Sequence, residues 1–329
     1  MFTLKSKLAV YLLLAFAIAL LAGCGQTPSG TAATPDKPSA AAPTGDKPQY
    51  PRTITHALGK TVIEKMPERP VIIWGEFYMA GNAVSLGVIP VAMTDNPTWY
   101  KNEQGLPSYL IDSLKQTKHI GRANPINYEL LIEQKPDVII IGNSPMYTAA
   151  YEQLNKIAPT IVITKYSDFE SAHRDIAAIF GKESLADTQI RESKEYAAQA
   201  KNRLAQTLGK EKVAVIEVNG KSIWQHDDSP IANLIFQELG ATPAYPIVSN
   251  GKAESISMEG LASTDPDRIL LYWTSKESFA ELEKNEVWKQ MRAVKGGKVT
   301  LSEKSIEWSA SHPPGRKFTI DELTQIWNH

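Results

Sequence analysis

Short runs of β-branched and apolar residues recur along the chain and alternate with segments in which apolar residues follow helical spacing. Continuous apolar runs of this length are typical of parallel strands that are covered on both faces. The intervening segments, such as Asn127–Gln134 and Ala149–Ile157, are predicted to be helices, so the alternation indicates an α/β protein. The strands that we expect are Val71–Trp74, Val138–Ile141, Ile161–Thr164, Val213–Val218 and Ile269–Trp273.

One long polar segment separates the strands into two groups. Glu183–Leu208 contains neither Gly nor Pro, is rich in Ala, Glu, Lys, Gln and Arg, and is followed by Gly209. This composition predicts one continuous helix that ends at the glycine, and its length of about 40 Å is enough to connect two lobes. We therefore expect an N-terminal lobe over residues 50–182, a connecting helix over 183–209 and a C-terminal lobe over 210–329, with limited bending between the lobes.

Two motifs occur in the same order in both halves of the chain. Leu86–Pro90 and Leu239–Pro243 both read Leu-Gly-x-x-Pro, and each is followed by a glutamate, Glu129 or Glu259, that precedes a Pro-Asp pair by seven positions. A repeated, ordered pair of motifs is the signature of an internal repeat. The sequence therefore predicts two lobes of similar topology.

The first 24 residues have the pattern of a secretory signal. Two lysines precede an apolar run from Leu8 to Ala22, and small residues precede Cys24. The run has about fifteen apolar residues, fewer than the roughly twenty of a membrane-spanning helix, although length alone leaves an uncleaved anchor open. Leu-Ala-Gly-Cys resembles a bacterial lipobox, so we expect removal of residues 1–23 and lipidation of Cys24.

The residues that follow have a different composition. Residues 25–49 are rich in Pro, Ala, Thr, Ser and Gly and lack large apolar side chains. Such a segment cannot bury a core, so residues 24–49 are predicted to form a flexible, semi-extended linker between the lipid and the folded part, which begins near Tyr50.

Charge and cysteine content exclude several classes of protein. The chain has 35 basic and 36 acidic residues, and removing residues 1–23 takes away two lysines, which leaves 33 against 36 and a net charge of −3. This balance gives no reason to expect nucleic acid as a partner. Because Cys24 is the only cysteine, an intramolecular disulfide, a cysteine-based zinc site and an iron–sulfur cluster are excluded.

Signatures of catalysis and of metal binding are missing from the sequence. There is no Gly-x-Ser-x-Gly, no His-Glu-x-x-His and no glycine-rich phosphate loop, so we expect no catalytic residue. The six histidines are scattered without the i, i+4 spacing of a helical metal site, so we expect no metal site either. His173 and His329 are expected at the surface.

Several segments between Tyr50 and the C-terminus occur together in one known family. They are Ser85–Gly87, Lys118–Arg122, Asn127–Glu129, Lys135–Asp137, Leu154–Thr160, Val287–Lys295 and Gly297–Val299. On these residues the chain resembles the iron-siderophore and cobalamin substrate-binding proteins of ABC importers. The resemblance implies two Rossmann-like α/β lobes joined by a single long helix, with the ligand cleft between the lobes.

The resemblance also implies a function. It implies a monomeric, non-catalytic lipoprotein without a cofactor, anchored on the extracytoplasmic face of the cell membrane of a Gram-positive bacterium. Its ligand would be a ferric siderophore, and its partner would be the permease of an ABC importer with its ATPase. Cobalamin or haem is the alternative ligand within the family, and a surface lipoprotein that binds a protein partner is the alternative from another class.

Aromatic and basic residues in loops are the candidates for ligand binding. Ligands of open α/β lobes bind beyond the carboxyl ends of the strands, and aromatic walls supply contact area there. For each aromatic residue core packing is the alternative, and for each basic residue a solvated surface position is the alternative. Trp288 and Trp327 lie in helical patterns and are expected in the core. The candidates are Trp74, Trp99, Tyr100, Arg122, Lys165, Tyr166, Trp224, His226, Trp273 and Trp308.

The C-terminal lobe departs from the family near one pair of strands. Members that bind carboxylate or hydroxamate siderophores often carry an arginine near the segment that corresponds to Val215–Gln225, where this chain has none. Asp227 and Asp228 follow instead, and they would repel an anionic chelate if they faced the cleft. The sequence thus weakens the expectation of a strongly anionic ligand.

The two repeated glutamates have a local and a functional interpretation. Glu129 and Glu259 each lie two residues after a plausible helix N-cap, Asn127 and Ser257. A carboxylate in the first turn of a helix is stabilised by the helix dipole, by about 0.3–1 kcal/mol. The resemblance implies in addition that one exposed glutamate on each lobe docks onto arginines of the permease.

Overall fold

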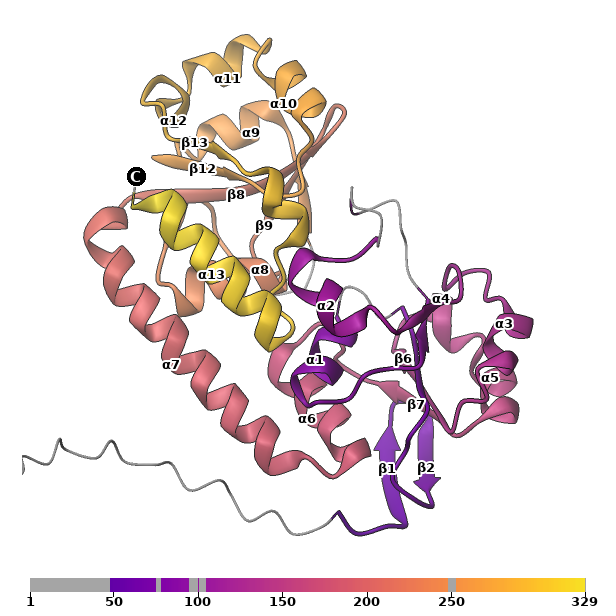
Figure 1. The fold of residues 1–329 in the computed structure, drawn as a ribbon. Helices are drawn as coiled ribbons and strands as arrows, with labels where there is room; N and C mark the ends of the chain where they lie inside the picture. The colour runs from indigo at the N-terminus through magenta and orange to yellow at the C-terminus, as the bar shows by residue number, and fades with distance from the viewer. Residues whose placement is uncertain (1–47, 75–77, 95–99, 101–104, 248–252, 329) are drawn as a thin grey trace, which may run out of the picture. The chain divides into compact units, whose positions relative to one another are not determined.

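Two β-sheets organise the chain in a computed structural model, which describes residues 48–74, 78–94, 100, 105–247 and 253–328 (Figure 1). The first sheet has the order β5-β4-β3-β6-β7, and all of its pairings are parallel. Its three longer strands are buried along their whole length, as expected of continuous apolar runs. Its strands are β3 (Pro70–Ile73), β4 (Ala92–Met93), β5 (Lys118–His119), β6 (Val138–Gly142) and β7 (Thr160–Ile163).

The second sheet has the order β11-β9-β8-β12-β13, with β10 also paired to β8. Strand β8 pairs in parallel with β10 and β12, and β12 pairs in parallel with β13. Strand β9 pairs antiparallel with both of its neighbours, β8 and β11. A separate hairpin, β1 (Arg52–His56) with β2 (Gly59–Ile63), precedes the first sheet. The strands of the second sheet are β8 (Lys212–Asn219), β9 (Ser222–His226), β10 (Thr242–Pro243), β11 (Ala253–Ile256), β12 (Arg268–Leu271) and β13 (Val299–Leu301).

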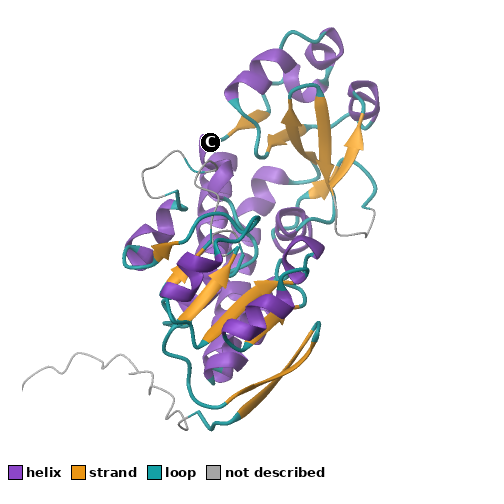
Figure 2. Cartoon of the chain, turned by 90° about the vertical axis from the view of Figure 1, so that its right-hand side faces the viewer, coloured by secondary structure: helices purple, strands orange, loops and turns teal. Residues whose placement is uncertain are grey.

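Helices cover both faces of the first sheet (Figure 2). Successive residues of β3 point to opposite faces, so Ile72 packs with α1, α2 and α6 while Val71 and Ile73 pack with α3, α4 and α5. This arrangement confirms the predicted α/β fold. The helices of this half are α1 (Ala80–Ser85), η1 (Ser108–Leu110), α2 (Ile111–Leu114), α3 (Tyr128–Glu133), α4 (Pro145–Thr148), α5 (Tyr151–Ile157) and α6 (Phe169–Phe180).

The predicted long helix is present as α7 (Glu183–Leu208), 26 residues that lie between the two sheets in chain order. Trp288 and Trp327 are buried in the core of the second half, as expected. None of the helices in the described ranges is long and apolar enough to span a membrane. The remaining helices are α8 (Pro230–Asn233), the π-helix η2 (Leu234–Glu238), α9 (Met258–Ser263), α10 (Lys276–Leu282), α11 (Glu286–Gln290), α12 (Arg292–Lys295), η3 (Glu303–Glu307) and α13 (Pro313–Trp327).

The repeated glutamate motif forms the same unit twice. The side chains of Asn127 and Ser257 each accept a hydrogen bond from the backbone N–H three residues later, at 3.1 and 3.0 Å, which confirms both predicted N-caps. Helices α3 and α9 then run for six residues each. Both end before a residue with positive φ, Lys135 at 49° and Asp265 at 43°.

The Pro-Asp pair that follows joins each helix to its sheet. The carboxylate of Asp137 accepts hydrogen bonds from the backbone N–H groups of Glu68 and Arg69, just before β3, at 2.7 and 2.8 Å. In the second half the carboxylate of Asp267 accepts one from the backbone N–H of Lys212, at the start of β8, at 2.8 Å. Strands β6 and β12 follow directly and pair with β3 and β8. The predicted internal repeat is therefore a structural one.

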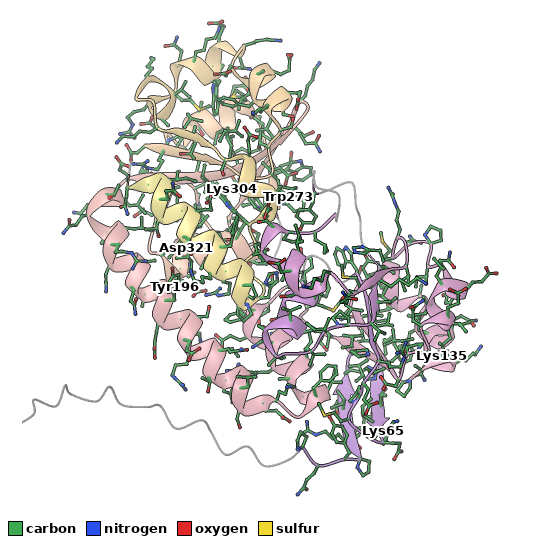
Figure 3. All side chains as sticks on the ribbon, viewed as in Figure 1. Lys65, Lys135, Tyr196, Trp273, Lys304 and Asp321 are labelled. Atoms are coloured by element: carbon green, nitrogen blue, oxygen red, sulfur yellow. The ribbon has the colours of Figure 1, made fainter. Side chains whose placement is uncertain are left out.

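The C-terminal helix α13 packs along α7, and a buried cation fixes the contact. Arg316 is 2% exposed, and its guanidinium donates to Ser193 Oγ of α7 at 2.8 Å and to the Glu238 carboxylate of η2 at 2.5 Å. It also lies over the ring of Phe169 of α6, 4.4 Å from the ring centre. Nearer the surface, the Tyr196 hydroxyl of α7 donates to Asp321 of α13 (Figure 3).

His173, expected at the surface, is instead fully buried. Its ring nitrogens lie 2.9 Å from Asn82 Oδ1 and 2.8 Å from Gln189 Oε1. The amide of Asn82 donates in turn to the backbone carbonyl of Ser311 at 2.9 Å. The expectation was wrong because polar side chains lie on both sides of the ring, and the hydrogen bond that its N–H donates to an amide oxygen lowers the cost of burial. His329 lies outside the described residues.

We expect His173→Leu to lower the free energy of unfolding by about 1–3 kcal/mol, because an amide oxygen beside the buried ring loses its hydrogen-bond donor. Chemical denaturation followed by circular dichroism measures this. The matched control is His119→Leu, which changes an exposed histidine in β5. Equal losses in the two variants would contradict a structural role for the buried ring.

Candidate functional site

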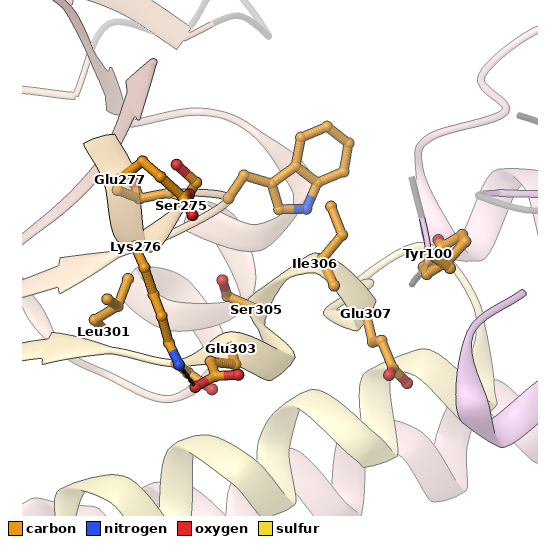
Figure 4. Close-up of a pocket in the computed structure, with 12 residues that line it drawn as sticks. Tyr100, Ser275, Lys276, Glu277, Leu301, Glu303, Ser305, Ile306 and Glu307 are labelled. Carbon is orange, nitrogen blue, oxygen red and sulfur yellow. Dashed lines mark ion pairs between the residues drawn. The ribbon is translucent and has the colours of Figure 1, made fainter. Parts of the chain in front are cut away.

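A cavity of about 450 Å³ lies at the carboxyl ends of β12 and β13 (Figure 4). The segment 273–277, which follows β12, and residues of the segment 301–307, which follows β13, form most of its wall. Tyr100, from the first half of the chain, lines the opposite side. Ligands of open α/β sheets bind at this end of the strands, so the cavity is a candidate ligand site.

The turn after β12 holds an indole at the cavity wall. Trp273 has φ of 51°, a left-handed conformation that is uncommon for a bulky residue and clusters at functional sites. The next residue fixes the turn, because the Thr274 hydroxyl accepts from the backbone N–H of Val218 at 2.9 Å and donates to the carbonyl of Tyr272 at 3.2 Å. Ser275 then caps α10, accepting from the N–H of Ser278 at 3.1 Å.

Four charged side chains line this cavity, and three of them are acidic. Lys276 forms an ion pair with Glu303, and this hydrogen bond raises the pKa of the lysine. The carboxylate of Glu307 accepts from the backbone N–H of Ser108 at 2.8 Å and from its hydroxyl. Glu277 is the third carboxylate. The described lining therefore carries two more negative than positive charges.

A smaller cavity of about 150 Å³ shares Trp273 with the first. His226 lines it, with Nδ1 at 3.1 Å from Ser229 Oγ and Nε2 at 3.4 Å from the Glu217 carboxylate. The Tyr272 ring lies edge-on to the imidazole at 5.0 Å between ring centres. Burial raises the pKa of Tyr272 well above its ordinary value, so its phenol stays neutral and can act as a hydrogen-bonding group.

Tyr78 connects the smaller cavity to an aromatic cluster in the first half of the chain. The rings of Trp74 and Tyr166 lie 5.3 and 5.2 Å from that of Tyr78, and the ring of Tyr147 lies 4.8 Å from that of Trp74. Trp74 has φ of 63°, and its backbone N–H donates to Thr94 Oγ1 at 2.6 Å. Burial raises the pKa of Tyr78, so this phenol is also neutral.

The structure brings some of the predicted ligand residues to the cavities. Tyr100 and Trp273 line the larger one, and His226, Trp273 and Trp308 line the smaller one. Trp74 and Tyr166 reach the smaller cavity only through Tyr78. Ligand contact stays a prediction for each of these residues.

Three further candidates lie away from the cavity walls. Arg122 and Lys165 are exposed in the loops after β5 and β7 and line neither cavity. Trp224 is 38% exposed and also lines neither cavity. It lies opposite Glu217 in the β8–β9 pairing, so it shares the sheet face of Glu217 and His226. Cys24 and Trp99 lie outside the described residues.

Trp308 is a core side chain as well as a wall of the smaller cavity. It is fully buried, and its ring stacks on Tyr272 at 6.3 Å between ring centres. It lies in the segment between η3 and α13, where the backbone N–H of Ser311 donates to Ser309 Oγ and the Ser311 hydroxyl donates to the carbonyl of Ser167 in the first half of the chain. The loop position that suggested ligand binding is therefore also a packing position.

Sequence reasoning missed Tyr78, Glu217, Glu303 and Glu307. Glu217 gave a signal, because it is a charged residue inside the apolar run of β8. The two later glutamates gave none, since they follow β13, a three-residue strand that the sequence did not predict. Among the described residues, no three His, Asp or Glu side chains form a group that could hold a metal ion.

Asp227 and Asp228 do not supply the repulsion that the sequence suggested. Asp227 is fully buried and lines neither cavity. The Asp228 carboxylate accepts from the side-chain amide of Asn233 at 3.2 Å, within its own loop.

Comparisons with known proteins place this geometry in a family. The family model described as periplasmic binding protein matches residues 80–305. Bacillus subtilis YhfQ, whose name describes an ABC transporter substrate-binding lipoprotein, is 26% identical over 290 residues, 82% of this chain and 86% of YhfQ. The Fe(3+)-citrate-binding protein YfmC of the same organism is 27% identical over 305 residues, 90% of each chain. Staphylococcus aureus SirA complexed with staphyloferrin B superposes with a TM-score of 0.73 at 25% identity, covering 84% of this chain and 98% of SirA.

We expect Trp308→Ala to lower the free energy of unfolding by about 3–5 kcal/mol, because it empties a large buried volume. Trp224→Ala should cost about 1 kcal/mol or less, since the side chain is partly exposed on a strand. Urea unfolding followed by far-ultraviolet circular dichroism compares the two. A smaller loss for Trp308→Ala than for Trp224→Ala would contradict the placement of these indoles.

Proposed function

We propose that this chain, which belongs to the periplasmic binding protein family, captures a ferric siderophore outside the cell membrane and delivers it to the permease of an ABC importer. The observation that carries the proposal is the cavity at the carboxyl ends of β12 and β13, with Trp273 on its wall and Tyr100 opposite. The chain acts by binding and release, without a catalytic step.

The size and lining of the cavity suit such a ligand. A ferric siderophore is a bulky complex whose iron is already coordinated by its own oxygens, so the protein needs flat walls and a few polar groups. A volume of about 450 Å³ lies within the range of small-molecule sites. Trp273, Tyr100 and Ile306 supply apolar contact, and the hydroxyl group of Ser305 is a potential hydrogen-bonding group.

The N-terminal residues support a membrane location for this binding step. Lipidation of Cys24 would hold the folded part at the extracytoplasmic surface, with residues 25–49 as a spacer of at most about 85 Å when extended. A monomer tethered in this way meets its permease by motion in the plane of the membrane. The resemblance to a lipobox carries this part of the proposal.

Glu129 and Glu259 are proposed to dock the loaded protein onto the permease. Both are exposed in the first turn of a short helix, and the same cap and the same Pro-Asp clamp fix each helix to its sheet. Each carboxylate is therefore presented from a rigid element rather than from a loop. Two such carboxylates, one on each half of the repeat, would bring both halves into contact with the permease at the same time.

The binding experiment uses tryptophan fluorescence during titration with a neutral ferric trihydroxamate. We expect saturable quenching, and we expect Trp273→Ala to weaken binding by about 10- to 100-fold, the order of removing one buried aromatic contact. Trp224→Ala is the matched control, because that indole lines neither cavity. Unchanged affinity in a folded Trp273→Ala variant would contradict the site. Saturable binding of cobalamin or haem alone, or of no ligand, would contradict the proposed function.

For docking, we expect Glu129→Lys combined with Glu259→Lys to reduce uptake of the ferric complex by cells at least tenfold while leaving its affinity in solution unchanged. Charge reversal replaces attraction to a basic partner by repulsion. Glu192→Lys together with Glu195→Lys reverses two exposed carboxylates on α7 and serves as the control. Uptake at the wild-type rate by the Glu129, Glu259 variant would contradict the docking role.

A further inference from the structure

We propose that the larger cavity selects ferric chelates of neutral or positive net charge and discriminates against anionic ones. The inference rests on the proposed function and adds the class of chelate. It is carried by the charges of the cavity wall and by the positions of the basic side chains around it.

The acidic groups come from two separate segments that meet at the cavity. Glu277 lies in the first turn of α10, and Glu303 and Glu307 begin and end η3. Lys276 is the only basic side chain among the described residues of the lining, and its ammonium already pairs with Glu303. Figure 4 shows Glu307 between this ion pair and Tyr100. The described lining of the cavity therefore presents more carboxylates than ammonium groups to a ligand.

The adjoining cavity has the same character. Glu217 is the acidic side chain in its lining, and His226 lies beside it at 3.4 Å. The described lining of the smaller cavity contains neither lysine nor arginine. A ligand arm that extends past Trp273 into this space would meet a carboxylate again.

Three other basic side chains lie outside the described lining of both cavities. Arg316 is buried, and its guanidinium is occupied by Glu238, Ser193 and the carbonyl of Ala310. Arg122 and Lys165, which the sequence offered as partners for an anionic chelate, line neither cavity. The described part of the chain therefore places no cluster of cations against the ligand.

The chemistry of ferric complexes turns this charge pattern into selectivity. Three hydroxamates neutralise Fe³⁺, so a trihydroxamate complex is neutral, and a pendant amine makes it a cation. Three catecholates leave a trianion, and citrate-type complexes are also anionic. Like charges repel at the short distances of a binding site, and water and salt screen the repulsion because the Glu303 side chain is 72% exposed.

The test uses three ferric linear trihydroxamates that share one iron-binding backbone and differ only at the terminal amine. The free amine gives one positive charge, its acetylated form is neutral, and its succinylated form carries one negative charge. We expect affinity to fall in that order by about fivefold per unit of charge at low ionic strength, and the differences to shrink in high salt. Isothermal titration calorimetry measures all three.

Two pairs of substitutions localise the effect. Glu277→Gln with Glu303→Gln removes two carboxylates from the wall and should bring the three affinities within about twofold of each other. Glu281→Gln with Glu286→Gln removes two carboxylates that pair with Lys284 and Lys289 and line neither cavity. This control makes the same change in net charge and should keep the wild-type order of the three affinities.

The outcomes separate this inference from the proposed function. Equal affinities, a reversed order, or an order that the wall substitutions leave unchanged would overturn the charge selectivity while the proposed function stands. Binding of a ferric tris-catecholate or ferric citrate but of none of the three trihydroxamates would do the same. Failure to bind any ferric chelate would overturn both.

Discussion

The buried guanidinium of Arg316 is the constraint on which the arrangement of the site depends. A charge that is withdrawn from water is tolerated only when it is paired and hydrogen-bonded, and Arg316 meets this requirement by joining α13 to α7, η2 and the ring of Phe169. Its third nitrogen, Nη1, donates to the carbonyl of Ala310 at 3.3 Å, in the segment between η3 and α13. That segment directly follows the cavity-wall residues of η3. The hydrogen bonds that the buried Arg316 requires therefore also fix the position of the wall.

Hydrogen bonds to the first half of the chain also hold this segment between η3 and α13. Asn82 binds the carbonyl of Ser311, and the Ser311 hydroxyl donates to the carbonyl of Ser167 at 2.7 Å. Glu307 accepts from Ser108 in the first half of the chain. These contacts all come from the first half of the chain and reach residues 307–311, which Arg316 holds from the second half. The ligand site is thus built on a segment that the core holds at several points, which suits a protein that must bind a rigid complex in one geometry.

The sequence carried more information about the fold than about the site, and the reason is physical. The strands, the caps at Asn127 and Ser257 and the α7 helix follow from local rules of burial, capping and turn chemistry, and the structure confirms them. Trp273 could be proposed because it follows a strand directly. Glu307 could not, because it follows the short strand β13, which the sequence did not predict. Tyr78 could not, because only tertiary packing brings the loop after β3 together with the second sheet. His173 was misjudged because burial of a polar residue depends on its partners and not on its neighbours in sequence, and for the same reason the sequence left both core packing and ligand contact open for Trp308.

The central claim is that a ferric chelate binds against the segments that follow β12 and β13. Amide hydrogen exchange followed by mass spectrometry, with and without a saturating neutral ferric trihydroxamate, tests it most directly, because bound ligand slows local opening of the backbone it contacts. The account predicts increased protection in peptides that cover residues 272–277 and 301–308, with peptides of the β1–β2 hairpin unchanged. Saturable binding that leaves both of those segments unprotected would contradict it.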